Sequence, residues 1–227
     1  MLGRRMLRET FHFLWHAPNT LWHKVRLSQA DLYDVLMTRA EARGLAERRR
    51  VLAAGAQGRV LEVGCGTGLL FAHYTDMAQV TAIDPDPTFL EKARERARNC
   101  GARVVVEHGD VQELPFEAGT FDTVVVCLVL CSVPSPERAL AECARVLAPG
   151  GTLRMLEHVV SERPVAKAFM HAVDPLWLAA NGQGCHLDRD TLRSVRDAGF
   201  TIDEDEPFQL WSPGLPAFPM RFVVARR

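Results

Sequence analysis

Three glycines at alternate positions follow a short apolar run near residue 60. Residues 60–63 have the composition of a buried strand, and Gly64, Gly66 and Gly68 come directly after it, ahead of a segment from Leu69 that resembles the first turns of a helix. Glycine reaches positive φ and lets a ligand approach the backbone, and free N–H groups at a helix start favour polar or anionic ligands. The segment therefore predicts a nucleotide-type binding loop.

The spacing of these glycines limits which nucleotide can be expected. Counted from Gly64, the dinucleotide fingerprint G-x-G-x-x-G needs its last glycine at position 69, where the chain has Leu69. The chain instead reads E-x-G-x-G-x-G from Glu62 onward. The pattern therefore disfavours a dehydrogenase, and nicotinamide binding would be the observation that contradicts this interpretation.

Acidic residues follow the next two expected strands. Asp84 ends the strand expected at 79–84, where a carboxylate can accept hydrogen bonds from a ribose diol. The same carboxylate can cap the helix that begins near Pro85, and the two roles are compatible. Asp110 ends the strand expected at 102–110, within the run HGDVQELPF, where it is either a ligand-binding acid or an ordinary loop acid.

The elements that must position these residues alternate along the chain. The alternation predicts a parallel α/β sheet with a small antiparallel addition. Residues 161–187 do not fit it, and we expect them to line a ligand crevice at the carboxyl side of the sheet. The remaining helices are expected at 29–54, 85–101, 137–148 and 188–200, the remaining strands at 121–130 and 152–159, and a closing hairpin at 201–211 and 220–227.

Together these motifs, with LAPGG at 147–151, lie in order over residues 58–158 and resemble the core of the class I S-adenosylmethionine-dependent methyltransferases. The resemblance implies an α/β fold, a Rossmann-like three-layer sandwich with a mostly parallel seven-stranded sheet and a C-terminal antiparallel hairpin. It implies S-adenosylmethionine as cofactor and S-adenosylhomocysteine as product. It also implies an N-terminal helical lid at 1–55 and a methyltransferase domain at 56–227 with a substrate-side insertion at 161–187.

The resemblance assigns roles in cofactor binding residue by residue. Asp84 would bind the ribose and Asp110 the adenine amino group, with the next residue packed on the adenine ring. Glu62 would orient the glycine loop and the methionine end, where Cys127 and Leu128 would supply backbone groups and a wall. The residues expected at the cofactor are Glu62, Gly64, Cys65, Gly66, Thr67, Gly68, Asp84, Pro85, Asp110, Val111, Cys127 and Leu128.

A finer resemblance concerns the methyl acceptor. The runs CLVLCSVPSPERALAECARVLAPGG, LEHV, DPLW and GCHLDRDT are similar to the methyltransferase-like alkyl thiol methyltransferase group and its bacterial relatives, up to about residue 200. This implies a small-molecule acceptor, with a thiol or sulfide favoured. The alternatives are N- or O-methylation of an amine, a phospholipid head group or a hydroxylated metabolite, and a non-catalytic module that binds the cofactor.

Few titratable residues stand where an acceptor would lose its proton. The segment after the fourth strand, which carries histidines in many related enzymes, has Cys131 and Ser132 instead, so His158 is the best candidate to deprotonate or orient an acceptor. His158 could also be a hydrogen-bonded structural histidine, and Cys131 a small buried apolar residue. Three residues of the insertion are expected to shape the acceptor pocket: Asp174, Trp177 and Cys185.

A metal site is not expected, because the histidines, cysteines and acids lack zinc-type spacing. An arsenite methyltransferase would need several cysteines at its substrate, and the spacing of Cys127, Cys131 and Cys185 does not favour one.

Composition sets the remaining bounds. The chain has 227 residues, a net charge of -1 and no block of basic residues with interleaved aromatics, which argues against a nucleic-acid partner. Six cysteines without a C-x-x-C pair fit free thiols in a reducing cytoplasm. Residues 1–27 are basic and contain tryptophan, so they could fold over the site, contact a membrane surface peripherally or pack on the domain. The sequence does not set the oligomeric state.

Overall fold

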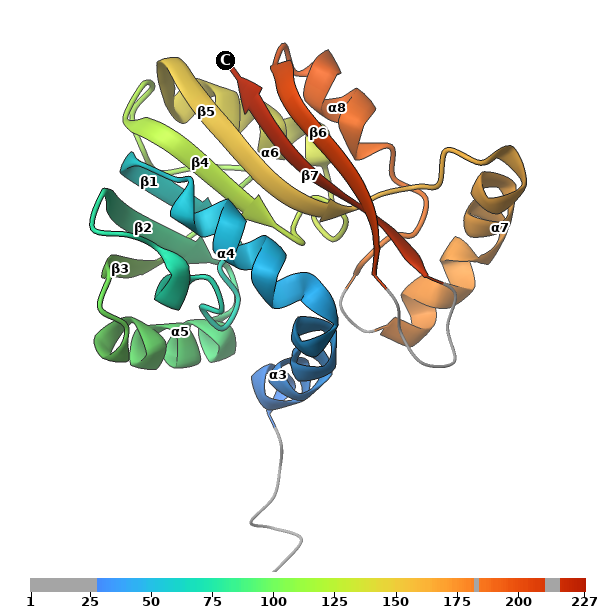
Figure 1. The fold of residues 1–227 in the computed structure, drawn as a ribbon, viewed down its shortest axis with the longest axis horizontal. Coiled ribbons are helices and arrows are strands. Elements are labelled where there is room, and N and C mark those ends of the chain that lie inside the picture. Colours follow the sequence, from blue (N-terminus) through green and yellow to red (C-terminus); the bar gives the residue numbers. More distant parts are fainter. Residues whose placement is uncertain (1–27, 182–183, 211–216) are drawn as a thin grey trace, which may run out of the picture.

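The computed structural model describes residues 28–181, 184–210 and 217–227. They form a seven-stranded sheet in the order β3-β2-β1-β4-β5-β7-β6 (Figure 1). Strands β1 to β5 pair in parallel, whereas β7 runs antiparallel to β5 and β6, which confirms the predicted fold class. The strands are β1 (Gly58–Val63), β2 (Ala78–Asp84), β3 (Arg103–His108), β4 (Phe121–Cys127), β5 (Leu147–His158), β6 (Thr201–Leu210) and β7 (Phe218–Arg226).

Helices cover both faces of the sheet. On one face Leu140 and Val195, from two helices, are fully buried against the strands, and on the other Leu52 and Leu90 play the same part. A strand buried on both faces reads as a continuous apolar run, which explains the sequence of β4. The helices are α3 (Gln29–Ala40), α4 (Ala46–Ala54), α5 (Pro87–Asn99), α6 (Pro136–Val146), α7 (Pro164–Asn181) and α8 (Thr191–Asp197).

The helix expected at 29–54 is bent rather than continuous. A π-helical turn, η1 (Glu41–Leu45), joins α3 to α4, and within it Gly44 has a φ of 104°. Because this φ cannot continue a right-handed helix, the chain bends there and α3 leaves the line of α4 (Figure 1). The lid expected at 1–55 is thus described only from residue 28, and the predictions for 1–27 lie outside the described residues.

Asp34 on α3 joins the N-terminal helices to the rest of the molecule. Its carboxylate accepts a hydrogen bond from the Thr67 hydroxyl at 2.7 Å and pairs with Lys92 and Arg96, each at 2.9 Å. Burial alone would raise the pKa of Asp34, but hydrogen bonds from Lys92, Thr67 and Arg96 lower it below its ordinary value. The glycine loop, α3 and α5 therefore meet at one carboxylate.

Two local predictions are wrong. No α-helix follows Gly68: the chain makes turns and then a 3-10 turn, η2 (Phe71–His73), in which the Phe71 N–H donates to Gly68 and the His73 N–H to Leu70. The strand expected at 121–130 ends at Cys127, because Leu128 adopts a φ of 61°, which a strand does not allow.

The segment that did not fit the alternation forms α7, which lies beyond the β6–β7 hairpin at one end of the molecule (Figure 1). Its exposed side includes Val165, Phe169 and Leu176. Among the described residues, no helix is long and apolar enough to cross a membrane.

Replacing Asp34 with alanine should lower the free energy of unfolding by about 1–3 kcal/mol, because charged hydrogen bonds between three elements are lost. The loss should shrink as pH falls from the ordinary carboxyl pKa through the lowered pKa of Asp34 in the folded state. Urea unfolding measures both effects.

Glu47→Ala is the matched control, since the Glu47–Arg50 pair is well exposed and screened by solvent, so its loss should change stability much less. Equal losses in the two variants would show that the Asp34 contacts do not hold the N-terminal helices.

Candidate functional site

The three glycines of the loop serve different purposes. All have positive φ: 61° at Gly64, 55° at Gly66 and 82° at Gly68. A Cβ at Gly64 would lie 2.6 Å from the Val129 side chain, and one at Gly68 would lie 2.5 Å from the Phe71 ring, so these two glycines permit close packing. At Gly66 the nearest atom would be 3.7 Å away. This position leaves the backbone open to a ligand, as a cofactor-binding loop requires.

Asp84, at the end of β2, holds the loop. Its carboxylate accepts hydrogen bonds from the backbone N–H groups of Gly66 and Asp86, both at 2.9 Å, and burial raises its pKa. The Cys65 N–H donates to the Ile83 carbonyl at 2.9 Å. The prediction of a helix start with free N–H groups is therefore wrong. A carboxylate accepts more than two hydrogen bonds, so Asp84 keeps capacity for a ribose diol.

The other residues predicted to bind the cofactor at this loop differ in their contacts and in how exposed they are. The Thr67 hydroxyl is bound to Asp34, so it faces α3, and Cys65 is buried in the core. Pro85 is exposed beside Asp84.

Asp110 and Val111 follow β3 in a short turn. The Asp110 carboxylate is exposed and accepts from the Gln112 N–H at 2.8 Å. The Val111 side chain is buried in the core, within the cluster that includes Ile83. Their roles at the adenine stay predictions.

Glu62 and Cys127 lie at the carboxyl ends of two paired strands, β1 and β4. Burial raises the pKa of Glu62 to about 8, and the carboxylate accepts a hydrogen bond from the Tyr74 hydroxyl at 2.8 Å. Burial likewise raises the pKa of the Cys127 thiol to about 12. Glu62 is therefore predominantly protonated at neutral pH when nothing is bound beside it.

Glu157 on β5 was not among the predicted residues. Its fully buried carboxylate accepts the backbone N–H groups of Val129 at 2.7 Å, Leu130 at 3.1 Å and Cys131 at 3.3 Å. Burial raises its pKa to about 7, although these three bonds oppose the shift. The signal in the sequence was an acid within an otherwise apolar strand, since a buried carboxylate must be hydrogen-bonded.

Four residues predicted from the sequence gather around the loop after β4, which contains residues 129–131: Cys131, His158, Trp177 and Cys185. The His186 N–H donates to the Cys131 carbonyl at 2.8 Å and joins the two segments. Contact with Cys131 lowers the pKa of Cys185 below its ordinary value despite burial, and contacts with His158 and Trp177 act in the same direction. Neither ring nitrogen of His158 has a hydrogen-bond partner among the described residues.

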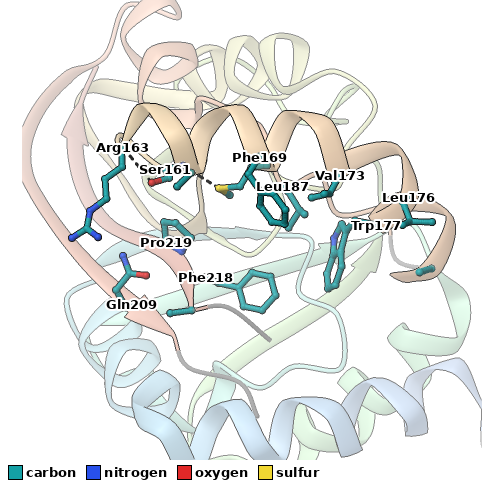
Figure 2. A pocket seen from close by; sticks show the side chains of 14 residues that line it. Ser161, Arg163, Phe169, Val173, Leu176, Trp177, Leu187, Gln209, Phe218 and Pro219 are labelled. Carbon is teal, nitrogen blue, oxygen red and sulfur yellow. Dashed lines mark hydrogen bonds between the residues drawn. The ribbon is translucent and has the colours of Figure 1, made fainter. Parts of the chain in front are cut away.

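A cavity of about 720 Å³ opens beside this cluster, between α7 and the start of β7. Figure 2 shows Phe169, Val173 and Trp177 on α7 facing Phe218 and Pro219. The cavity borders the cluster directly, because the ring of Phe218 lies 5.4 Å from that of His158 and 5.6 Å from that of Trp177. The polar lining consists of Ser161, Arg163 and Gln209. The cavity thus suits an apolar ligand.

Asp174 and Cys185 do not line the cavity. The Asp174 carboxylate accepts from the Leu187 N–H at 2.6 Å and pairs with His186 at 2.8 Å, so it positions the chain after α7. Whether Asp174 and Cys185 shape the acceptor pocket therefore stays a prediction, with Cys185 lying in the cluster beside the cavity rather than in its lining. Ligand atoms of Asp174, His186 and Asp188 lie within 4.8 Å of one another, but Asp174 and His186 already bind each other.

Residues 61–155 match the family model of the methyltransferase domain. A thiol S-methyltransferase of Homo sapiens is 40% identical over 171 residues, which cover 70% of this chain and 68% of that protein. A phosphatidylethanolamine N-methyltransferase of Cereibacter sphaeroides is 36% identical over 159 residues (69% and 75%), and a ubiquinone biosynthesis O-methyltransferase of Xanthomonas euvesicatoria is 42% identical over 172 residues (72% and 70%).

Solved structures share the fold. An S-adenosylmethionine-dependent methyltransferase of Thermotoga maritima superimposes with a TM-score of 0.64 at 22% identity, covering 86% of this chain and 95% of that one. Another from Mesorhizobium loti gives 0.61 at 20% identity, covering 83% and 98%.

Asp84→Ala should weaken S-adenosylmethionine binding by about tenfold or more, because a charge-assisted contact with the ribose is lost along with the support of the loop. Isothermal titration calorimetry measures the affinity. Asp86→Ala is the control. It removes the carboxylate that caps α5 by accepting the Thr88 N–H, and it leaves the predicted ribose contact in place. Unchanged affinity in Asp84→Ala would make the ribose assignment wrong.

The ligand-free protein should lose stability as pH rises. Glu62 has a raised pKa in the folded state, so its contribution is fully present below the ordinary carboxyl pKa and is lost up to about pH 8. In Glu62→Gln this slope should be reduced, and urea unfolding at several pH values measures it. The same slope in both proteins would contradict the buried, protonated state of Glu62.

Proposed function

This chain belongs to the S-adenosylmethionine-dependent methyltransferases, and within that family we propose that it methylates the sulfur of an apolar small-molecule thiol. The observation that carries the proposal is the apolar cavity next to the group formed by Cys131, His158 and Cys185. The identity to a thiol S-methyltransferase supports it.

The residues around the glycine loop fit the cofactor. Gly66 leaves an open approach, Asp84 offers a carboxylate for the ribose, and Asp110 is accessible beside them. When bound, S-adenosylmethionine supplies a methyl group on a sulfonium, so that a carbon–sulfur bond forms at the acceptor as the sulfonium bond breaks.

The chain's own task is to align the acceptor and to take its proton. A thiol reacts as the thiolate, and an ordinary thiol with a pKa of about 8.5 is only partly ionised at neutral pH. His158 is buried and neither ring nitrogen has a partner of hydrogen-bond geometry among the described residues, so the nitrogen that carries no hydrogen in the neutral ring can accept the thiol proton. The apolar walls formed by Phe218 and Trp177 exclude water from the acceptor.

A phospholipid head group or another amine is the second candidate. The 36% identity to a phosphatidylethanolamine N-methyltransferase favours it. An ammonium acceptor, however, calls for a negative neighbour, and the described residues that line the cavity include no acid. The cavity carries Arg163 instead, which disfavours a simple cationic amine but not the phosphate of a phospholipid head group.

Methyl transfer from labelled S-adenosylmethionine to a panel of acceptors tests the proposal. The panel holds alkyl thiols of increasing chain length, hydrogen sulfide, amines and phosphatidylethanolamine vesicles. We expect labelled product from the longer alkyl thiols. Label only on amines or lipids would remove the thiol assignment, and cofactor binding without any transfer would favour the non-catalytic alternative.

His158→Gln should lower kcat/KM for an alkyl thiol at pH 7 by roughly 10²–10⁴-fold, the usual contribution of a general base. The loss should shrink above pH 9, where the thiol ionises unaided. The exposed His171, which pairs with Asp188 at 2.8 Å, provides the control His171→Gln, which should keep full activity. An active His158→Gln enzyme at pH 7 would remove His158 from proton transfer.

A further inference from the structure

A buried cation lies on α4, near the glycine loop. The Arg49 side chain is only 4% exposed, and its Nε lies 2.9 Å from a carboxylate oxygen of Glu41. One Nη lies 3.8 Å from the Met37 sulfur, which is a weak acceptor. The Nε itself has no partner of hydrogen-bond geometry in the described structure. A buried guanidinium with so few strong acceptors carries a large desolvation cost.

The groups around Arg49 come from three elements that border the glycine loop. Tyr33 on α3, Glu62 on β1 and Cys127 on β4 all interact with its charge. The Tyr33 ring in turn lies 4.0 Å from the place of a Cβ on Gly66. Burial alone would lower the pKa of Arg49, but Cys127, Tyr33 and Glu41 raise it, so the group stays charged.

The order of the strands sets the direction in which the cofactor must lie. Asp84 ends β2 and Asp110 follows the edge strand β3, so the nucleoside occupies that side of the sheet. The methyl group must face the acceptor cluster, which includes His158 at the end of β5. The amino-acid part therefore lies over the ends of β1 and β4, where Glu62, Cys127 and Arg49 meet.

We infer that Arg49 binds the carboxylate of the cofactor's methionine part. A guanidinium forms paired hydrogen bonds with a carboxylate, and the contact supplies a strong acceptor for the Nη group that otherwise faces the Met37 sulfur. The ammonium of the same amino acid then lies on the side of Glu62. Its positive charge favours the ionised form of the Glu62 carboxyl. The inference rests on the proposed function only in that the methyl donor occupies the glycine loop.

Two ligands separate this role from a merely structural one. S-adenosylhomocysteine carries the carboxylate, whereas 5′-methylthioadenosine has the same nucleoside and sulfur without the amino acid. Isothermal titration calorimetry on the full chain would give both dissociation constants. Arg49→Gln should weaken S-adenosylhomocysteine by about tenfold to a hundredfold and 5′-methylthioadenosine by less than about twofold. Arg49→Lys, which keeps the charge, should fall between the two.

Arg50→Gln is the matched control, because it makes the same change one residue further along α4, at an exposed pair with Glu47. Both affinities should stay as in the unaltered chain. Since Arg49→Gln leaves Glu41 unpaired, the double variant Glu41→Gln, Arg49→Gln repeats the test in a pocket without either charge.

Equal weakening of the two ligands in the Arg49 variants, or no weakening, would overturn the inference. An unaltered chain that binds neither ligand would overturn it together with the cofactor site. Selective loss of S-adenosylhomocysteine in a chain that methylates no thiol would support the role of Arg49 and count only against the proposed acceptor.

Discussion

The carboxylate of Glu157 receives three consecutive backbone N–H groups, and both halves of the site are built around that contact. It holds residues 129–131 directly after the positive φ of Leu128. Val129 then packs so closely on the glycine loop that Gly64 has no room for a Cβ. On the other side Cys131 is held beside Cys185, and His158 follows Glu157 on the same strand. One buried acid thus sets the distance between cofactor loop and acceptor cluster.

This arrangement has an energetic cost. A non-glycine residue at positive φ costs about 1–3 kcal/mol, and burial raises the pKa of Glu157 to about 7 and of Glu62 to about 8. Such costs are typical of sites that must be in place before a ligand arrives, because backbone groups held in advance need no rearrangement during reaction. The large apolar core on both faces of the sheet offsets them.

The apolar cavity and the glycine loop lie in different parts of the fold. The cavity is lined by α7 and the start of β7, whereas the glycine loop, Asp84 and Asp110 belong to the parallel half of the sheet. The similar proteins carry names with sulfur, nitrogen and oxygen acceptors. The cavity walls and the loop around Gly66 belong to different elements, so a change in the cavity walls would leave that loop untouched.

The amino-acid sequence by itself determined the order of the strands, the glycine loop and the acid at Asp84, because each depends on neighbouring residues and their spacing. Only the tertiary structure decided that Arg96 binds the Thr67 carbonyl, that Asp174 accepts the Leu187 N–H after α7, and that Glu157 accepts backbone N–H groups of the loop after β4. Each of these is a contact between the side chain of one element and the backbone of another segment. Its partner is set by how elements pack, and no local pattern of residue types records that choice.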